Sequence, residues 1–553
     1  MSEARGEDST RTAASTGKKK KLHGREFYES IGSPKVILAP MVEQSEFAWR
    51  MLSRSFMPPD NRRGLLAYTP MFHARLFADV PKYRESSFQP TKSQLPDPPV
   101  GISKESLKEY DAHLDGNPQF DRPLFVQFCA NDPEKLLAAA KLVQPYCDAV
   151  DLNLGCPQGI ARKGHYGAFL QEDWDLIYRL INTLHKELDI PVTAKMRILE
   201  TKEKTLEYAK MILSAGASLI TVHGRQRHQK GHNTGLADWS VLKYLKEQLP
   251  PETVMFANGN VLQHDDIQAC LDATGVDGVM SAEGNLYDPS IFAPPPAIGE
   301  EGREYWRGKD GKGGYRMDAV MRRYLDIIYK YVLKQPAPER KPLFIPSDPV
   351  DEDSASKVVE EKVSQEESEP PKKKRKKSEK KNQTSDPNLS AMQPHLFSML
   401  RPLVTRHTHI RDALARSRSY DIASFERVLT MVEQVTKEAL IEYERTPSET
   451  NGSVDVLQEP SKDDFRTSSR AAMQRCKRPW WVCQPYIRPL PDEAFAKGAM
   501  QVSKKDKKKQ EDAAAAADNS LNAGIVADGA VKDISNSMEN EKLEMPQGAV
   551  VCG

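Results

Sequence analysis

A cysteine follows a short alternating segment and places a thiol at the tip of that segment. In residues 148–170, DAVDLNLGCPQGIARKGHYGAFL, apolar residues alternate with Asp151 and Asn153, which is the pattern of a β-strand. Pro157 cannot donate to a strand ladder, so the strand ends there and Cys156 lies at its carboxyl end. Cys156 is a candidate functional residue.

A single cysteine is more often a small buried hydrophobe than a reactive group. The surrounding residues favour the second interpretation here. Gly155 allows a ligand to approach the backbone closely, and Pro157 fixes the turn. The loop that follows holds three more glycines, Gly159, Gly164 and Gly167.

Polar residues also end the other apolar runs of the chain. A lone glutamine or histidine at such a place is usually a satisfied structural group. Lys195 is different, because a lysine among the apolar residues of VTAKMRI is costly unless an anion pairs with it. The polar or charged residues at these positions are Gln127, Asn153, Lys195, Arg197, His223, Arg225, Asn258, Asn260 and Glu283.

Eight apolar runs separated by helical patterns position these residues. The runs are 36–40, 65–70, 124–130, 149–155, 192–198, 219–225, 254–260 and 277–284. One intervening helix should begin with Asp132 as its N-cap and Pro133 as its first residue. Strands that alternate with helices pair in parallel, and eight such units form a (β/α)8 TIM barrel, an α/β fold with its active site at the carboxyl ends of the strands. An open doubly wound sheet is the alternative, but no GxGxxG follows the first run.

Composition limits the class of protein. The chain has 553 residues, of which 28% are charged, and a formal net charge of +1. No apolar run is long enough for a membrane span, so we expect no membrane contact. The seven cysteines show no spacing typical of zinc ligands, and we expect no metal site.

We expect the barrel to be followed by a C-terminal all-α RNA-binding domain, because three segments, 313–333, 395–407 and 424–445, have helical apolar spacing. Arginines are frequent between residues 401 and 418, and Trp480 and Trp481 either stack bases or fasten the chain to the helices. The predicted units are a disordered basic arm (1–24), the barrel (25–300), the first part of the helical domain (310–345), a disordered acidic and basic insertion (346–390), the rest of the helical domain (391–490) and a disordered tail (498–553).

The motif series resembles the FMN-dependent tRNA-dihydrouridine synthases. It comprises LAPM, VQFCAND, DLNLGCPQGIARKGHYGAFL, TAKMRI, TVHGRQRHQKGHNTGLADW, FANGN and GVMSAEG, in family order over about residues 35–295. GHYGAFL and PWWVCQPYIRP most resemble the eukaryotic branch that acts on D-loop positions sixteen and seventeen of tRNA.

The resemblance implies that bound FMN, reduced by NADPH, delivers hydride from N5 to C6 of uridine, and that Cys156 protonates C5. It implies cofactor contacts from Pro40, Met41, Val42, Gln127, Lys195, His223, Asn258, Gly259, Asn260, Ala282 and Glu283. It implies substrate contacts from Asn153, Arg197, Arg225, Arg227 and Lys230. Many bacterial relatives have GR where this chain has Ala282 and Glu283, so the Glu283 side chain cannot bind phosphate as an arginine would.

Two other functions stay open at this point: an FMN-dependent reductase of a small pyrimidine, as in dihydroorotate or dihydropyrimidine dehydrogenases, and an RNA-binding protein without catalysis. We expect tRNA as partner, with mRNA open as a second substrate, and a monomer. PKKKRKK at 371–377 is typical of a nuclear import signal and equally of a nonspecific RNA tether. We therefore expect the protein in cytoplasm and nucleus.

Overall fold

The computed structural model describes residues 21–92, 112–349, 386–445, 468–496 and 498. Eight strands form in the eight predicted runs: β1 (Val36–Leu38), β2 (Leu65–Tyr68), β4 (Leu124–Cys129), β5 (Ala149–Leu154), β6 (Val192–Arg197), β7 (Ile220–His223), β8 (Met255–Asn258) and β9 (Gly278–Ser281). They pair in parallel in the order β2-β1-β9-β8-β7-β6-β5-β4, and β2 also pairs with β4. The sheet therefore closes, which confirms the TIM barrel and excludes the open sheet.

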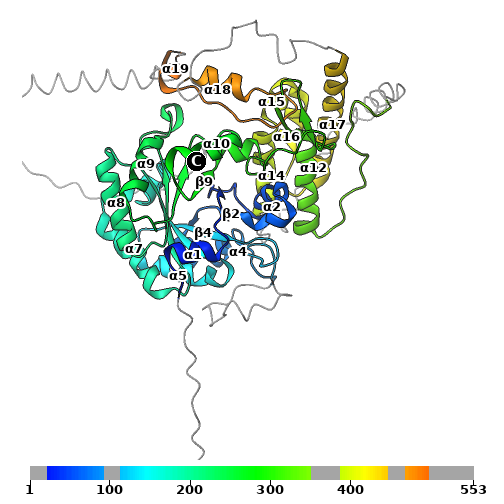
Figure 1. The fold of residues 1–553 in the computed structure, drawn as a ribbon. Helices are drawn as coiled ribbons and strands as arrows, with labels where there is room; N and C mark the ends of the chain where they lie inside the picture. The colour runs from blue at the N-terminus through cyan, green and yellow to red at the C-terminus, as the bar shows by residue number, and fades with distance from the viewer. Residues whose placement is uncertain (1–20, 93–111, 350–385, 446–467, 497, 499–553) are drawn as a thin grey trace, which may run out of the picture.

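Helices surround this barrel (Figure 1). They are α1 (Gly24–Ser30), α2 (Phe47–Phe56), α3 (Ala74–Asp79), α4 (Pro81–Glu85), α5 (Pro133–Val143), α6 (Gly159–Lys163), α7 (Trp174–Glu187), α8 (Lys202–Ser214), α9 (Trp239–Gln248), α10 (Asp265–Thr274) and α11 (Glu283–Tyr287). A short strand, β3 (Phe72–His73), pairs in parallel with the end of β4. Helix α5 begins as predicted: the Asp132 carboxylate accepts from the backbone N–H groups of Glu134 and Lys135, and Pro133 is its first residue.

The interior of the barrel is polar at its carboxyl end. Residues two apart on a strand share a face, so Asp151 and Asn153 point the same way, opposite to Leu152 between them. The Tyr68 hydroxyl on β2 faces Thr193 and Thr221 on β6 and β7, strands that are not its neighbours in the sheet. This contact crosses the barrel and identifies the polar face as the inner one.

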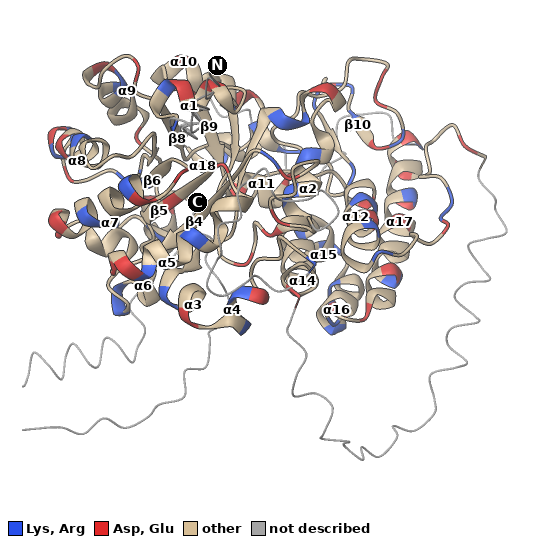
Figure 2. Cartoon of the chain, turned by 90° about the horizontal axis from the view of Figure 1, so that it is seen from below, with Lys and Arg blue, Asp and Glu red and all other residues tan. Residues whose placement is uncertain are grey.

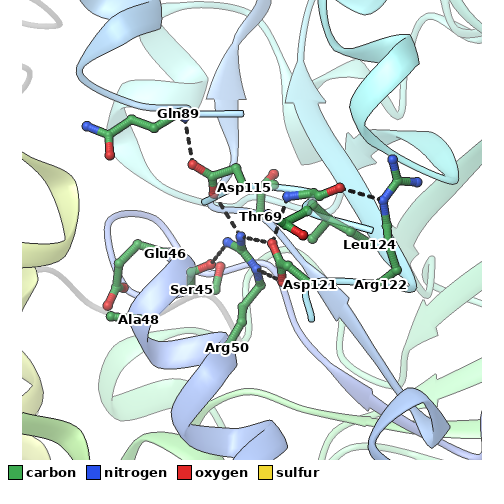
Figure 3. Close-up of polar contacts among 12 residues, drawn as sticks. Ser45, Glu46, Ala48, Arg50, Thr69, Gln89, Asp115, Asp121, Arg122 and Leu124 are labelled. Atoms are coloured by element: carbon green, nitrogen blue, oxygen red, sulfur yellow. Dashed lines mark hydrogen bonds and ion pairs between the residues drawn. The ribbon is translucent and has the colours of Figure 1, made fainter. Parts of the chain in front are cut away.

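A buried ion cluster fastens α2 to the segment that leads into β4 (Figure 3). The Arg50 guanidinium donates to both carboxylate oxygens of Asp121, at 3.1 and 2.5 Å, and to Asp115 at 2.7 Å. Its Nη1 donates to the Ser45 carbonyl at 2.8 Å. Burial raises the pKa of the Asp115 carboxyl, although Arg50 opposes that shift. Removing any one of these charged groups would leave an uncompensated charge buried in the protein, which is strongly destabilising.

The helical unit follows a hairpin, β10 (Tyr305–Arg307) with β11 (Gly313–Tyr315). It contains α12 (Met317–Ile327), the π-helical turn η5 (Ile328–Leu333), α14 (Pro387–Met399), α15 (Arg401–Arg406), α16 (Thr408–Arg416), α17 (Ile422–Arg445), α18 (Ser469–Cys476) and α19 (Pro491–Ala496). The segments predicted as helices at 313–333 and 395–407 differ in detail, since residues 313–315 form a strand and the second segment divides between α14 and α15.

Helix α14 docks on α2 of the barrel. The imidazole of His395 stacks on Trp49 at 3.9 Å between ring centroids, and its Nε2 lies 2.9 Å from the Glu46 carboxylate that caps α2. Asn388 Oδ1 accepts from the Ala48 N–H at 2.9 Å. The barrel and the helical unit therefore share one hydrophobic core.

The tryptophan pair fastens the chain to the helices. Trp481 is buried against Trp306 and Tyr443, and its carbonyl accepts from the Met317 N–H at 2.9 Å. The ring of Trp480 packs on His407. Of the two interpretations of this pair, the structure supports the fastening one.

Some predicted boundaries are wrong. Residues 21–24, assigned to a disordered arm, are ordered because Lys21 Nζ donates to the carbonyls of His185 and Leu188 and the Gly24 N–H to Ser218 Oγ. The predicted insertion is too long at both ends: Asp348 pairs with Arg303 at 2.5 Å, and Asp386 caps α14. The rest of the insertion, the import signal at 371–377, the rest of the arm and nearly all of the tail lie outside the described residues. Among the helices that are described, none could cross a membrane.

Arg50→Met should lower the free energy of unfolding by about 3–5 kcal/mol, because it leaves two buried carboxylates without their cation. Urea unfolding measures the loss. The matched control is Arg75→Met, which removes an exposed pair with Asp132 at 3.4 Å and should change the free energy by less than about 1 kcal/mol. A loss at Arg50 no larger than the control would contradict the role of the cluster.

Candidate active site

Cys156 lies just past the end of β5, at the carboxyl-end mouth of the barrel. Its side chain is buried beside Cys129, Ala161 and Tyr166. The loop folds back on it, since the Ala168 N–H donates to the Cys156 carbonyl at 3.1 Å. Gly167 has a φ of +64°, and a Cβ there would lie 2.9 Å from the Cys156 Cβ. Only glycine allows this approach.

A chain of side-chain hydrogen bonds positions the thiol loop, the segment of residues 155–170 that follows β5. Gln127 Nε2 donates to the Asp151 carboxylate at 2.8 Å, and Asn153 Nδ2 donates to Gln127 Oε1 at 2.8 Å. Asn153 Oδ1 then accepts from the N–H groups of Cys156 and Gly155, at 2.8 and 3.1 Å. The carboxylate can only accept, so it fixes both amides in one orientation. Each amide nitrogen keeps one hydrogen for a ligand.

Charge is buried beside this chain. Asp151 accepts from Thr193 Oγ1 at 2.6 Å. Burial raises the pKa of its carboxyl to about 6, while Thr193, Gln127 and Lys195 oppose the shift. Lys195 lies on β6 in register with Asn153. The lysine predicted to need an anion thus has a buried carboxylate near it.

Three basic residues predicted to bind substrate also contact the thiol loop. Arg197 Nε donates to the Gly155 carbonyl at 2.8 Å, and Lys230 Nζ to the Pro157 carbonyl at 2.7 Å. Arg227 Nη1 donates to the Ala168 carbonyl at 3.1 Å and pairs with Glu172 at 2.6 Å. These contacts hold the loop from the end of β6 and from the segment that follows β7.

His223 and Arg225 form a second polar group at the mouth. Burial and the nearby Arg197, Arg225 and Lys195 hold the pKa of His223 well below its usual value, so the ring is neutral. Its Nε2 lies 3.0 Å from Arg225 Nη1. An arginine can only donate, so Nε2 accepts and the ring proton lies on Nδ1. Burial and Arg197 lower the pKa of Arg225 to about 10, which leaves it charged.

Two adjoining cavities open at the mouth and share Arg197 and His223. The larger, of about 530 Å³, is in the size range of small-molecule sites. The smaller, of about 10 Å³ beside Cys156, has room for about one water molecule. Val42 and Met71 line it and are not fully buried. Because the space is so small, a group larger than water reaches the thiol only if lining side chains move.

The larger cavity fits a ligand with a phosphate. Among the described residues, the buried Asn258 Oδ1 and Ser281 Oγ have no protein partner, and both residues line the cavity. Gly259 has a φ of +112°, and a Cβ there would lie 2.6 Å from the Ala237 Cβ and 3.2 Å from Arg225 Nη1. The missing side chain leaves backbone and guanidinium facing the same space.

Most of the predicted site residues meet here. The lining residues of the two cavities include Pro40, Val42, Gln127, Asn153, Cys156, Lys195, Arg197, His223, Arg225, Lys230, Asn258, Gly259, Asn260, Ala282 and Glu283. Met41 is not among them, because its side chain packs in the core. Arg227 is not either, and Arg225 lies with His223 rather than on an outer face.

Sequence reasoning missed Asp151, Met71, Tyr486 and Arg488. Asp151 could have been found from its spacing of two from Asn153, which places both on one face. Tyr486 and Arg488 line the larger cavity from a segment about 200 residues away along the chain, and no local pattern indicates such a contact. No group of three or more His, Cys, Asp or Glu suited to a metal ion occurs in the described part of the chain.

The fold and the mouth define a (β/α)8-barrel enzyme with a thiol beside a site for a phosphate-bearing ligand. Residues 37–304 match the family model described as Dihydrouridine synthase. The chain is 41% identical over 499 residues to the tRNA-dihydrouridine(16/17) synthase [NAD(P)(+)] of Saccharomyces cerevisiae, covering 89% of this chain and 92% of the relative. Its Schizosaccharomyces pombe counterpart is 43% identical over 475 residues, covering 85% and 92%.

A Mus musculus protein named as similar to the same synthase is 46% identical over 288 residues, covering 52% of this chain and 54% of that one. The chain belongs to the dihydrouridine synthase family.

The direction of the amide chain gives a prediction. Asn153→Asp places a carboxylate on each side of the Gln127 amide, which offers only one donor and one acceptor, and should cost about 1–3 kcal/mol of stability. The double variant Asp151→Asn/Asn153→Asp supplies the missing donor and should recover most of that loss. Thermal melting of the single and double variants measures both effects.

Asp151→Asn alone is the matched control, because its amide can accept from Gln127 and donate to Thr193. The Asn153→Asp penalty should also shrink as pH falls below about 6, where Asp151 gains a proton and can donate. A penalty equal at about pH 5 and pH 8, or no recovery in the double variant, would show that the chain does not set the geometry.

Proposed function

We propose that this protein reduces the C5=C6 bond of uridines sixteen and seventeen in the D-loop of tRNA, using bound FMN and NADPH. One observation carries the proposal: the Cys156 thiol and the His223–Arg225 group line adjoining cavities at one barrel mouth. The names of the two yeast relatives support both the substrate and the positions, because each alignment covers 92% of the relative's length.

FMN bound at the mouth supplies the hydride that adds to C6 of the uracil ring. The protein's own residues supply the rest. Cys156 gives its proton to C5, and the thiolate that remains lies in a cavity also lined by Lys195 and Arg197, whose positive charges stabilise it.

The residues at the mouth would hold the cofactor in two places. Lys195, Gln127, Pro40 and Val42 line the part of the mouth next to the thiol and would contact the flavin ring. His223, Arg225 and the backbone around Gly259 line the larger cavity and would hold the phosphate. The neutral imidazole can donate through Nδ1, and the guanidinium supplies charge.

A base stacked in a folded RNA reaches such a mouth only after it is extracted. The RNA must then be held by its backbone. The arginines 401, 406, 411, 416 and 418 are all exposed on and just after α15 and α16, and Arg401 lies 3.8 Å over the ring of Tyr486, which lines the larger cavity. This basic surface therefore adjoins the mouth. In contrast, acidic and basic residues are interspersed on α7 and α8 (Figure 2).

Cys156→Ala should bind FMN and be reduced by NADPH, but should form little dihydrouridine, because no proton reaches C5. General acids typically contribute about 10²–10⁴-fold. The test expresses the wild type or the variant in cells that lack the enzyme and maps dihydrouridine at each position of tRNA and of mRNA. Purified protein is examined in parallel for flavin absorbance and its bleaching by NADPH.

Wild-type protein that restores no dihydrouridine at positions sixteen and seventeen would refute the function. Full restoration by Cys156→Ala would refute only the acid role. Loss of flavin from the variant would mean that Cys156 acts on cofactor binding instead.

The basic surface predicts how tRNA affinity depends on salt. Each phosphate contact adds about 0.7–0.9 to the slope of log K against log salt. Arg411→Gln/Arg416→Gln should therefore weaken tRNA binding and reduce that slope by about one to two. Lys204→Gln on α8, an exposed residue paired with Glu200, is the control and should change neither. Filter binding over a series of salt concentrations measures both, and an unchanged slope in the double variant would locate the RNA elsewhere.

A further inference from the structure

The chain returns from the helical unit to the barrel mouth near its end. We call residues 468–490 the C-terminal strap. In Figure 1 its helix α18, in orange, lies above the barrel near α10. Arg475 in the strap pairs with Asp266 on α10 at 2.7 Å. Its last part, residues 485–490, lines the larger cavity. The strap is therefore part of the site and not only a connection.

Arg488 in the strap meets Glu283, the residue that follows β9 and Ala282. Its Nε lies 3.0 and 3.2 Å from the two Glu283 oxygens, and its Nη2 lies 2.5 Å from Oε1. The Arg488 side chain is 37% exposed. Among the described residues, no protein acceptor lies within hydrogen-bond distance of its Nη1. Glu283 thus fixes the guanidinium by one edge and leaves the other edge available.

Arg225, which also lines this cavity, has fewer N–H groups available for a ligand than Arg488. Arg225 donates through Nε and Nη2 to the Gly235 carbonyl, through Nη2 to Asn260 Oδ1, and through Nη1 toward His223. The Arg225 pKa is affected by the charges of both Glu283 and Arg488, so the three groups lie close together. Arg488 is the guanidinium with the more available donors.

We propose that Arg488 binds the phosphate of the cofactor, with Glu283 as the residue that positions it. This inference rests on the proposed function, in which FMN occupies the mouth. The carboxylate at position 283 then orients a guanidinium brought from the strap instead of binding the anion itself. The two positive charges of Arg488 and Arg225 exceed the single negative charge of Glu283, which suits a dianionic phosphate.

The strap also connects the proposed phosphate site with the basic surface of the helical unit. The ring of Tyr486 packs on Tyr287 of α11, and Arg401 of α15 covers its face. The strap that holds the phosphate is therefore in contact with the surface that we assign to RNA.

The test compares FMN with riboflavin, which has the same ring system and lacks the phosphate. The full-length chain is freed of flavin, and each ligand is titrated while its fluorescence is followed. Arg488→Leu should weaken FMN binding by about 10- to 100-fold, the usual worth of a hydrogen bond to a charged group, and should change riboflavin binding less than about twofold. Arg470→Leu is the control, because Arg470 is exposed on the same strap and does not line the cavity. It should change neither affinity.

The outcomes separate the proposals. Wild-type protein that binds FMN no better than riboflavin would refute the phosphate site and this inference with it. Wild-type protein that prefers FMN, with an Arg488→Leu variant that keeps that preference, would overturn the inference alone. An Arg488→Leu variant that loses affinity for both flavins equally would also overturn it, since Arg488 would then only hold the strap closed.

A rescue variant tests the position of the guanidinium. Glu283 and Arg488 place their charged groups 2.5 Å apart, so an arginine at position 283 would reach the same end of the cavity. Arg488→Leu/Glu283→Arg should regain at least about tenfold of the lost FMN affinity, with riboflavin affinity unchanged. No regain would overturn the claim that phosphate lies between these two positions.

Discussion

The site depends on a carboxylate that the barrel buries beneath its mouth. Asp151 is fully buried, and its carboxylate accepts hydrogen bonds from Thr193 and Gln127. A carboxylate accepts only, and this single restriction orders the amides of Gln127 and Asn153 in sequence until the last oxygen reaches the Cys156 N–H. The position of the thiol therefore depends on the orientation of the Asn153 amide, which depends on that of Gln127, which the Asp151 carboxylate sets. An apolar residue at position 151 would allow the side-chain amides of Gln127 and Asn153 to flip, which exchanges the positions of their oxygen and nitrogen atoms.

The fold was predictable because its pattern is local. Eight apolar runs and their intervening helices can be read from short stretches, and the closure of the ring follows from their number. The inner and outer faces of the strands were harder to assign. The polar residues of β5 point inward, toward Gln127 and Thr193, whereas alternation in an ordinary sheet places polar residues toward water. A barrel mouth that binds a polar ligand reverses this expectation.

Charged residues gave the clearest limits to sequence reasoning. Arg197, Arg227 and Lys230 are basic residues that we expect to contact substrate, and the structure adds a contact that the sequence did not indicate, since each donates to a backbone carbonyl of the protein. A sequence shows that a guanidinium is present but not which acceptors surround it. Nor does a sequence indicate partners at long range. Arg488 and Glu283 are separated by 205 positions, and their meeting depends on how the helical unit directs the chain back over the barrel.

That return path explains why the helical unit must be rigidly joined to the barrel. Helix α14 is held on α2 by the stacked pair of His395 and Trp49 and by the bond from His395 to Glu46. Glu46 also caps α2, about one turn from Arg50, whose ion cluster fixes the same helix to the barrel. A strap anchored to a unit that moved by even 1 Å would carry its guanidinium out of hydrogen-bond reach of an anion at the mouth. Buried charge at the junction and the placement of Arg488 are therefore one requirement, because Arg488 reaches the mouth from a strap that packs against the helical unit, and that unit is held on α2 of the barrel.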